Sequence, residues 1–273
     1  MEGRYYYGVP LVTVFAPDDA RLDEYRNIPD SELVERRGRF VAEGRLVVTR
    51  LLAERTLVTR SVMVTGTARA SLSDVLAARP EVPVYVVPQG LMDEIAGFNV
   101  HRGCLAIGDR PRPARWQDLT SGPLVVLERV ANADNVGSVF RNAAAFSAGG
   151  VLLDPASTDP LYRKAIRTSM GAALIVPFAR AEPWPGVLHE LRAQGVTLVA
   201  MTTSVHAPTL RQCAAAVAGC RTALVLGHEG DGLSQAALDA CDRQARIPMA
   251  PGVDSLNVAS ASAVALYELG RAG

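Results

Sequence analysis

The sequence predicts an α/β protein in which a small α/β domain precedes a larger domain built on a parallel sheet. Three observations predict this class. Short, near-continuous apolar runs alternate with helical patterns, which is typical of a parallel sheet covered on both faces. The chain has 273 residues, enough for about two domains. Hydrophobic residues make up 49% and charged residues 21% of the chain, so global disorder is excluded.

A polar segment rich in turn formers predicts where the two domains meet. Residues 108–113 include an aspartate, two arginines and two prolines, and this composition indicates a linker. We therefore expect one domain with its linker over residues 1–112 and a second domain over residues 113–273. In the first domain the predicted strands are residues 39–42, 61–64 and 82–87, and the predicted helices are residues 44–54 and 91–95.

The second domain alternates strands and helices more strongly. Its predicted strands are residues 123–127, 150–153, 196–200, 223–226 and 245–249, and its predicted helices include residues 136–146, 184–193 and 258–271. Open parallel sheets bind ligands at the carboxyl ends of their strands. We therefore expect function in the loops that follow Leu127, Ala200, Leu226 and Met249.

Charge and cysteine content exclude several classes of protein. The formal net charge is zero, which argues against nucleic-acid binding by bulk charge alone. No run approaches the about 18 apolar residues of a membrane span, and the first residues lack a signal-peptide layout. The four cysteines form no C-x-x-C pair. This spacing favours reduced, mostly buried thiols in a cytoplasmic protein and no metal site.

The first functional loop candidate spans residues 132–142 and contains Asn135 and Arg141. Six residues of α-helix rotate a side chain by about 240° after full turns, so the two would share no face if both were helical. They could converge on one cleft if Asn135 lay in a loop or capped the helix. Taken alone, the motif fits a helix N-cap at Asp134 or Asn135 followed by a solvated arginine.

The second candidate is the glycine-rich loop over residues 226–234, which directly follows a predicted strand. Its three glycines permit close backbone approach to a ligand, and Glu229 would lie at the carboxyl end of that strand. The pattern is neither G-x-G-x-x-G nor a Walker A motif, and Lys164 is the one lysine in the chain. A tight turn with Ser234 capping the next helix explains the same residues.

The third candidate runs from Ile247 through Asn257 into an alanine-rich helix. Small residues over 259–263 permit close packing of that helix, and Ser255 or Asn257 could simply cap it. Each of the three loops is weak evidence when taken singly.

In their order and spacing the three loops resemble the SpoU (TrmH) family of the SPOUT class of RNA 2′-O-ribose methyltransferases. The likeness covers residues 122–271 and includes residues 164–171. It is carried by Asn135, Arg141, Gly227, Glu229, and residues 247–249 and 255–258. Residues 30–107 are similar to the RNA substrate-binding domain attached to the ribosomal-RNA members. In the third loop, many members have glycine where Pro251 stands, which affects the expected loop path.

The resemblance implies a C-terminal trefoil knot, a homodimer and S-adenosylmethionine as the cofactor. It implies that Arg141 grips a phosphate beside the target hydroxyl and stabilises the developing alkoxide, a task that suits a planar guanidinium. His228 is the next candidate for catalysis. The remaining site residues carried over by position are, for catalysis, Asn135, Glu229, Ser255 and Asn257, and, for the cofactor, Thr202, Gly227, Ile247, Met249 and Leu256.

A basic stretch in the first domain predicts where RNA binds. Residues 36–60 contain seven arginines against two glutamates, although a solvated helix face with ion pairs would have the same composition. The predicted RNA-binding residues are Arg36, Arg37, Arg39, Arg45 and Arg50.

The leading function is methylation of a ribose 2′-hydroxyl in RNA, and the first domain favours ribosomal RNA. Transfer RNA is the second substrate class. A catalytically idle RNA-binding or ribosome-assembly protein is a third hypothesis, against which the intact Asn135, Arg141, Glu229 and Asn257 count. A small-molecule nucleotide enzyme is the weakest hypothesis because its phosphate loop is missing.

Overall fold

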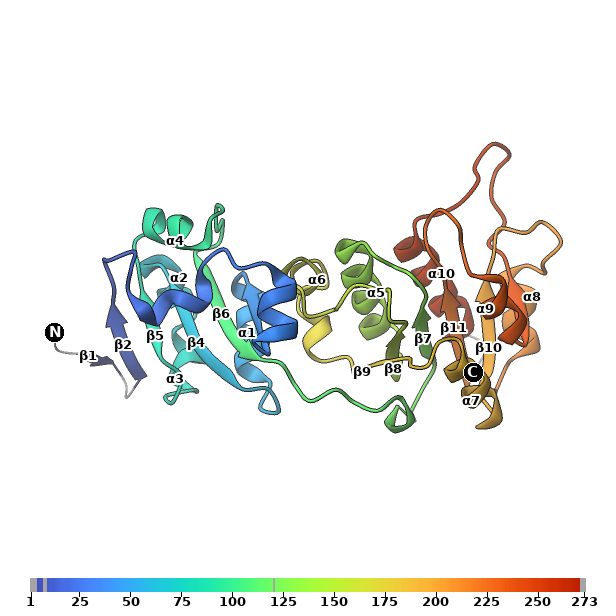
Figure 1. Cartoon of the computed structure of the whole chain (residues 1–273), viewed down its shortest axis with the longest axis horizontal. Coiled ribbons are helices and arrows are strands. Elements are labelled where there is room, and N and C mark those ends of the chain that lie inside the picture. Colours follow the sequence, from blue (N-terminus) through green and yellow to red (C-terminus); the bar gives the residue numbers. More distant parts are fainter. Residues whose placement is uncertain (1–3, 7–8, 120, 271–273) are drawn as a thin grey trace. The chain divides into compact units, whose positions relative to one another are not determined.

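The computed structural model describes residues 4–6, 9–119 and 121–270, which form two compact units (Figure 1). The first unit comprises Met1–Arg112 together with Leu161–Leu174, and the second comprises Pro113–Pro160 and Ile175–Gly273. The segment Leu161–Leu174 therefore groups with the first unit, although the sequence suggested a single division at residue 112.

The first unit contains a mixed six-stranded sheet in the order β1-β2-β5-β4-β6-β3. The middle strands β2, β5 and β4 pair in parallel, and the outer pairs are antiparallel. The strands are β1 Arg4–Tyr6, β2 Val9–Thr13, β3 Arg39–Glu43, β4 Thr59–Val64, β5 Val84–Val86 and β6 Cys104–Asp109.

Amphipathic helices accompany this sheet. In α1, Val47, Val48, Leu51 and Leu52 are buried at the spacing of an amphipathic helix, while Leu46 is exposed. The helices of the unit are α1 Arg45–Ala53, α2 Gly66–Ser71, α3 Ser73–Ala77, α4 Gln89–Ala96 and α6 Arg163–Thr168, with short helical turns η1 Ala20–Tyr25, η2 Glu32–Arg36 and η4 Ala172–Leu174.

The second unit is built on a six-stranded sheet in which every pairing is parallel. Its order is β12-β10-β11-β7-β8-β9, so all carboxyl ends lie at one edge. The chain first moves outward from β7 and then returns on the other side of it. Ligands of open α/β sheets bind at the carboxyl ends of the strands. The strands are β7 Leu124–Leu127, β8 Gly150–Leu153, β9 Phe178–Arg180, β10 Thr197–Met201, β11 Thr222–Leu226 and β12 Arg243–Ala245.

Helices α5 and α10 pack against each other. The Asn142 amide of α5 donates to the Ala259 carbonyl at 2.7 Å and to the Ser262 hydroxyl at 2.8 Å, and Ser262 is fully buried. The small side chains over residues 259–263 thus lie where two helices meet. The helices of the unit are α5 Ala133–Ala145, α7 Gly186–Ala193, α8 Leu210–Ala216, α9 Gln235–Ala240 and α10 Val258–Gly270, with the short turn η3 Trp116–Asp118.

The predicted α/β class and parallel sheet are confirmed, and the trefoil knot stays a prediction from the family resemblance. Two element predictions need correction. The strand predicted over residues 245–249 is β12 Arg243–Ala245, and Ile247 and Met249 line a pocket instead. The linker predicted over residues 108–113 begins inside β6, which ends at Asp109. Residue 271, the predicted end of the last helix, lies outside the described residues.

Helices long and apolar enough to span a membrane are absent from the described part of the chain.

Candidate functional site

A pocket of about 350 Å³ opens at the carboxyl edge of the parallel sheet in the second unit. It is formed by the residues after β10, the glycine-rich loop after β11 and the segment that leads into α10. All five residues predicted to hold a cofactor line it, and so do Glu229 and Ser255. The site residues predicted from the sequence that line the pocket are Thr202, Gly227, Glu229, Ile247, Met249, Ser255 and Leu256.

The glycine-rich loop is folded back on itself at Gly227. A Cβ atom at this position would lie 2.4 Å from the carbonyl carbon of Gly232, which leaves no room for a side chain. His228 Nδ1 accepts hydrogen bonds from the backbone amides of Gly230 at 3.0 Å and Asp231 at 3.2 Å. The imidazole therefore shapes the loop, and the loop presents backbone to the pocket.

A buried carboxylate anchors the far end of this loop. Glu128 directly follows β7 and is only 2% exposed. It accepts hydrogen bonds from the Ser234 amide at 2.7 Å, the Ser234 hydroxyl at 2.6 Å and the indole Nε1 of Trp184 at 2.8 Å. Ser234 also caps α9, as predicted. Glu128 is a functional residue that sequence patterns did not indicate, and its one signal is a charge at the end of an apolar strand.

Three predicted residues from distant parts of the chain form a hydrogen-bonded chain next to the pocket. Asn135 donates from Nδ2 to Glu229 Oε1 and accepts at Oδ1 from Asn257 Nδ2, which lies 2.9 Å away. Asn257 in turn accepts at Oδ1 from the amide of Ala259 at 2.8 Å, so it caps the start of α10. The first, second and third loops of the sequence analysis therefore meet at these three side chains.

Arg141 is placed differently from Asn135. Both lie within α5, whose cap is Asn132 and not Asp134 or Asn135. Six residues of helix turn Arg141 to another face, as the helical geometry predicted. Arg141 is exposed, and no other described residue forms a hydrogen bond or ion pair with it. Its guanidinium is available to a ligand.

The residues around the pocket fit an adenosine-containing sulfonium cofactor. The volume lies at the lower end of the range of small-molecule sites, about 300–1,000 Å³. Apolar side chains such as Ile247, Met249 and Leu256 can cover a flat base, and the loop beyond Gly227 offers backbone groups at close range. The acidic Glu229 and Asp254 also line the pocket, and their carboxylates suit a positively charged ligand.

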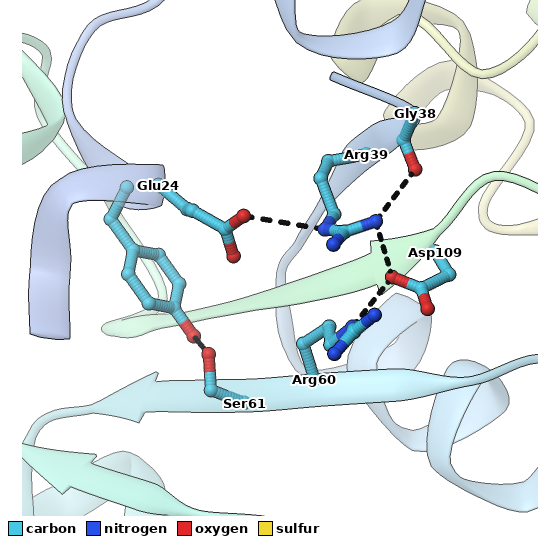
Figure 2. Close-up of polar contacts among 7 residues, drawn as sticks. Glu24, Gly38, Arg39, Arg60, Ser61 and Asp109 are labelled. Carbon is cyan, nitrogen blue, oxygen red and sulfur yellow. Dashed lines mark hydrogen bonds and ion pairs between the residues drawn. The ribbon is translucent and has the colours of Figure 1, made fainter.

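The arginines predicted to bind RNA lie in the first unit, and several of them already have partners. Arg39 pairs with Glu24 at 3.2 Å and Asp109 at 2.8 Å, and Arg60 shares Asp109 (Figure 2). Arg37 pairs with Glu32 at 2.6 Å, and Arg50 donates to the Met170 carbonyl at 2.7 Å. Arg36 and Arg45 are exposed and have no such contact with another described residue.

Comparison with known proteins agrees with this architecture. The sequence profile of the SpoU rRNA methylase family matches residues 122–267. A Mycobacterium tuberculosis protein described as an uncharacterized tRNA/rRNA methyltransferase is 42% identical over 272 residues, covering 97% of this chain and 94% of that protein. The chain belongs to the SpoU rRNA methylase family. It is an RNA methyltransferase of the SpoU/TrmH class.

Solved structures share the fold over nearly the whole chain. An rRNA methyltransferase from Sinorhizobium meliloti, crystallised with S-adenosylmethionine, has a TM-score of 0.80 at 23% identity, covering 96% of this chain and 98% of that one. An RNA 2′-O ribose methyltransferase has a TM-score of 0.77 at 25% identity, with 95% and 98% covered. Both likenesses include the first unit as well as the second.

Proposed function

We propose that the protein transfers a methyl group from S-adenosylmethionine to a ribose 2′-hydroxyl of ribosomal RNA. The observation that carries the proposal is the hydrogen-bonded chain Glu229–Asn135–Asn257, of which Glu229 lines the pocket. Polar side chains from all three loops converge there, beside a pocket whose residues fit the cofactor. One solved relative that is similar over nearly the full chain is a 2′-O ribose methyltransferase.

When bound, S-adenosylmethionine would supply the methyl group of its sulfonium and would leave as a neutral thioether once the bond from sulfur to methyl is exchanged for one from methyl to the 2′-oxygen, which loses its proton. Arg141 holds the phosphate next to the target ribose and stabilises negative charge on the oxygen. Asn135 and Asn257 orient the substrate, and Glu229 fixes the amide of Asn135. The proton of the 2′-hydroxyl passes to an oxygen of the phosphate that Arg141 holds, because a guanidinium, which stays protonated, cannot take it. Ser255, at the pocket wall, contributes a hydroxyl donor.

The first unit is proposed to bind the RNA, and its presence favours ribosomal RNA as substrate. The names of the sequence relatives include both tRNA and rRNA, so transfer RNA remains the second substrate class. We further propose that the protein acts in the cytoplasm.

We propose that the active form is a homodimer. Helix α10 exposes Val264 by 40% and Tyr267 by 48%, and the Tyr267 ring contacts Phe146 at the end of α5. Such side chains on packed helices suit a two-fold interface. Light scattering at micromolar concentration should give twice the mass of one chain. Full activity of a species with the mass of one chain would contradict the dimer.

Mapping of 2′-O-methyl groups tests the proposed function most directly. RNA from cells with and without the gene should differ at one or a few ribosomal-RNA positions, and purified protein with S-adenosylmethionine should restore them. If the difference is confined to transfer RNA, then transfer RNA becomes the proposed substrate. Cofactor binding with no methylation of any RNA would instead support the idle RNA-binding protein.

A further inference from the structure

A second hollow, of about 370 Å³, lies in the first unit at the start of α1 and α4. Arg45, the first residue of α1, lines it together with His101 and Arg102. Its other lining residues include Thr65, Thr67 and Gln89, and none of the lining side chains is a carboxylate. The hollow therefore combines two permanent positive charges with neutral hydrogen-bonding groups.

The two arginines are free to engage a ligand, unlike most of their neighbours in sequence. Arg45 and Arg102 are both exposed, and no described residue forms a hydrogen bond or ion pair with either. The carboxylate next to Arg45 in sequence, Glu43, pairs instead with Arg163 at 3.3 Å and Arg167 at 3.6 Å. By contrast, Arg39 and Arg60 are held by Asp109 (Figure 2).

The backbone brings the two arginines near each other. The Cδ atom of Arg102 lies 3.8 Å from the position that a Cβ on Gly44 would take, so its stem crosses the residue before Arg45. The Gly44 amide donates to the Cys104 carbonyl at 3.1 Å. Burial raises the pKa of the Cys104 thiol to about 11, and both arginines oppose this rise, because each lies close enough to favour the thiolate.

Hydrogen bonds and close backbone packing fix the walls of the hollow. The Thr65 amide donates to the Gly103 carbonyl at 2.9 Å, and a Cβ on Gly103 would lie 2.5 Å from the Thr65 hydroxyl. Gln89, which also lines the hollow, donates from its side-chain Nε2 to Asp93 Oδ1 at 2.8 Å and to the Val100 carbonyl at 3.2 Å. Asp93 Oδ1 also accepts from the backbone amide of Val100 at 2.8 Å. The loop that carries His101 and Arg102 is thereby ordered before any ligand arrives.

We propose that the hollow lined by Arg45, His101 and Arg102 binds a backbone phosphate of the RNA substrate. The proposal rests on the proposed function, because it takes RNA as the ligand. Two guanidinium groups and an imidazole N–H can donate to the oxygens of one phosphate group. No base is read at such a contact, so this site positions the RNA and leaves sequence selection to other contacts.

The salt dependence of RNA binding tests this site with a charge-matched control. The full-length double variant Arg45→Gln/Arg102→Gln should bind a fluorescein-labelled RNA hairpin more weakly than the parent. The slope of log K against log salt, measured from about 50 to about 200 mM KCl, should become shallower by about one per arginine.

The double variant Arg21→Gln/Arg26→Gln removes two charges that are already paired with Asp19 and Asp23, so its slope should match the parent. Arg45→Lys/Arg102→Lys keeps both charges and should retain most of the slope.

Equal slopes for the two glutamine variants would overturn the proposal. The proposal would also be wrong if inorganic phosphate bound in the hollow of the parent but the Arg45→Gln/Arg102→Gln variant bound RNA with the same affinity as the parent. The proposed function is tested separately, because the slope needs no turnover. If the parent methylates RNA and the salt-dependence slopes of the variants equal that of the parent, only the proposed phosphate site is wrong. If the parent does not methylate RNA, only the proposed function is wrong.

Discussion

The side-chain amide of Asn257 donates to Asn135 Oδ1 at 2.9 Å, and the two residues are 122 positions apart in sequence. The bond joins α5 to the residue that directly precedes α10. This bond fixes which way the Asn135 amide points, because its oxygen must face Asn257. Its nitrogen must then face Glu229, to which it donates. One asparagine thus couples the start of α10 to the glycine-rich loop.

Exchange of the hydrogen-bond donor and acceptor between residues 135 and 229 tests that coupling. Asn135→Asp places a second carboxylate opposite Glu229, so we expect the single-turnover methylation rate to fall at least about tenfold from loss of one charge-assisted bond and like-charge repulsion. The double variant Asn135→Asp/Glu229→Gln offers an amide donor to the new carboxylate and should recover part of the rate. A double variant no faster than Asn135→Asp would contradict the assigned orientation.

Arg141 should be needed for methyl transfer but not for cofactor binding. It is exposed, and it is absent from the residues that line the pocket. We expect Arg141→Ala to lower the single-turnover rate at saturating RNA and cofactor by about 10²–10³-fold, with little change in cofactor Kd. Arg141→Lys should also fail, because an ammonium cannot make paired planar contacts.

The matched control for Arg141 is Arg211→Ala, which removes another exposed arginine of the same unit that pairs only loosely with Glu268, at 3.6 Å. This variant should turn over like the parent. If Arg141→Ala also turned over near the parent rate, the catalytic assignment would be wrong and His228 would be the next residue to test.

Gly227→Ala should weaken cofactor binding through the backbone. The added methyl would overlap the Gly232 carbonyl carbon, and overpacking of this kind costs about 1–3 kcal/mol. We expect calorimetric titration with S-adenosylmethionine, after exhaustive chelation of metals, to show a Kd raised by about tenfold or more. Gly186→Ala is the control, since its Cβ would meet only Pro183 at 3.4 Å. Equal affinity of Gly227→Ala and parent would show that the loop is not held as described.

Replacement of the buried Glu128 should destabilise the second unit and loosen the glycine-rich loop. In Glu128→Gln an amide group replaces one of the two oxygens that accept from Trp184 and Ser234. We expect a loss of about 1–3 kcal/mol in the free energy of unfolding, measured by denaturant titration, and weaker cofactor binding. Glu190→Gln, on the exposed face of α7, should leave both quantities unchanged.

The four cysteines should differ in reactivity in a way that reports on folding. Burial raises the pKa of Cys104 to about 11 and that of Cys241 to about 12, and it also raises the pKa of Cys213. Since the thiolate is the reactive form, these three should alkylate slowly at pH 8. Cys220 is exposed and should react first. Mass spectrometry should find one fast-labelled cysteine in the native protein and four after denaturation; rapid labelling of Cys104 would contradict its burial.

Local sequence patterns predicted the parallel sheet because its strands are apolar on both faces. They failed where an apolar residue serves another purpose. Ile247 and Met249 line the pocket, and alternating hydrophobicity does not distinguish a pocket wall from a strand. Strand β6 was not predicted, and its polar end was assigned to the linker. Gly108 in that end makes room for Phe40, since a Cβ there would lie 2.3 Å from the Phe40 ring.

The site was predicted in its parts and not in its connections. Helical geometry indicated that Asn135 and Arg141 would face different ways if both were helical, and both lie on α5. The partners that Asn135 does contact are 94 and 122 residues away, and no local spacing encodes such pairs. The pairing of Arg39 with Glu24 and Asp109 is equally non-local, so composition overstated the number of arginines free for RNA.

The grouping of Leu161–Leu174 with the first unit limits how this protein can be divided by recombination. Glu43 is only 8% exposed, and the two arginines that neutralise it, Arg163 and Arg167, lie 120 or more residues downstream. A gene fragment that ends at Arg112 would encode the first sheet but leave this buried carboxylate without its cations, at a cost of several kcal/mol. The first unit is therefore not a module that a single exchange at residue 112 could pass to another enzyme. Any transfer has to bring the downstream segment with it.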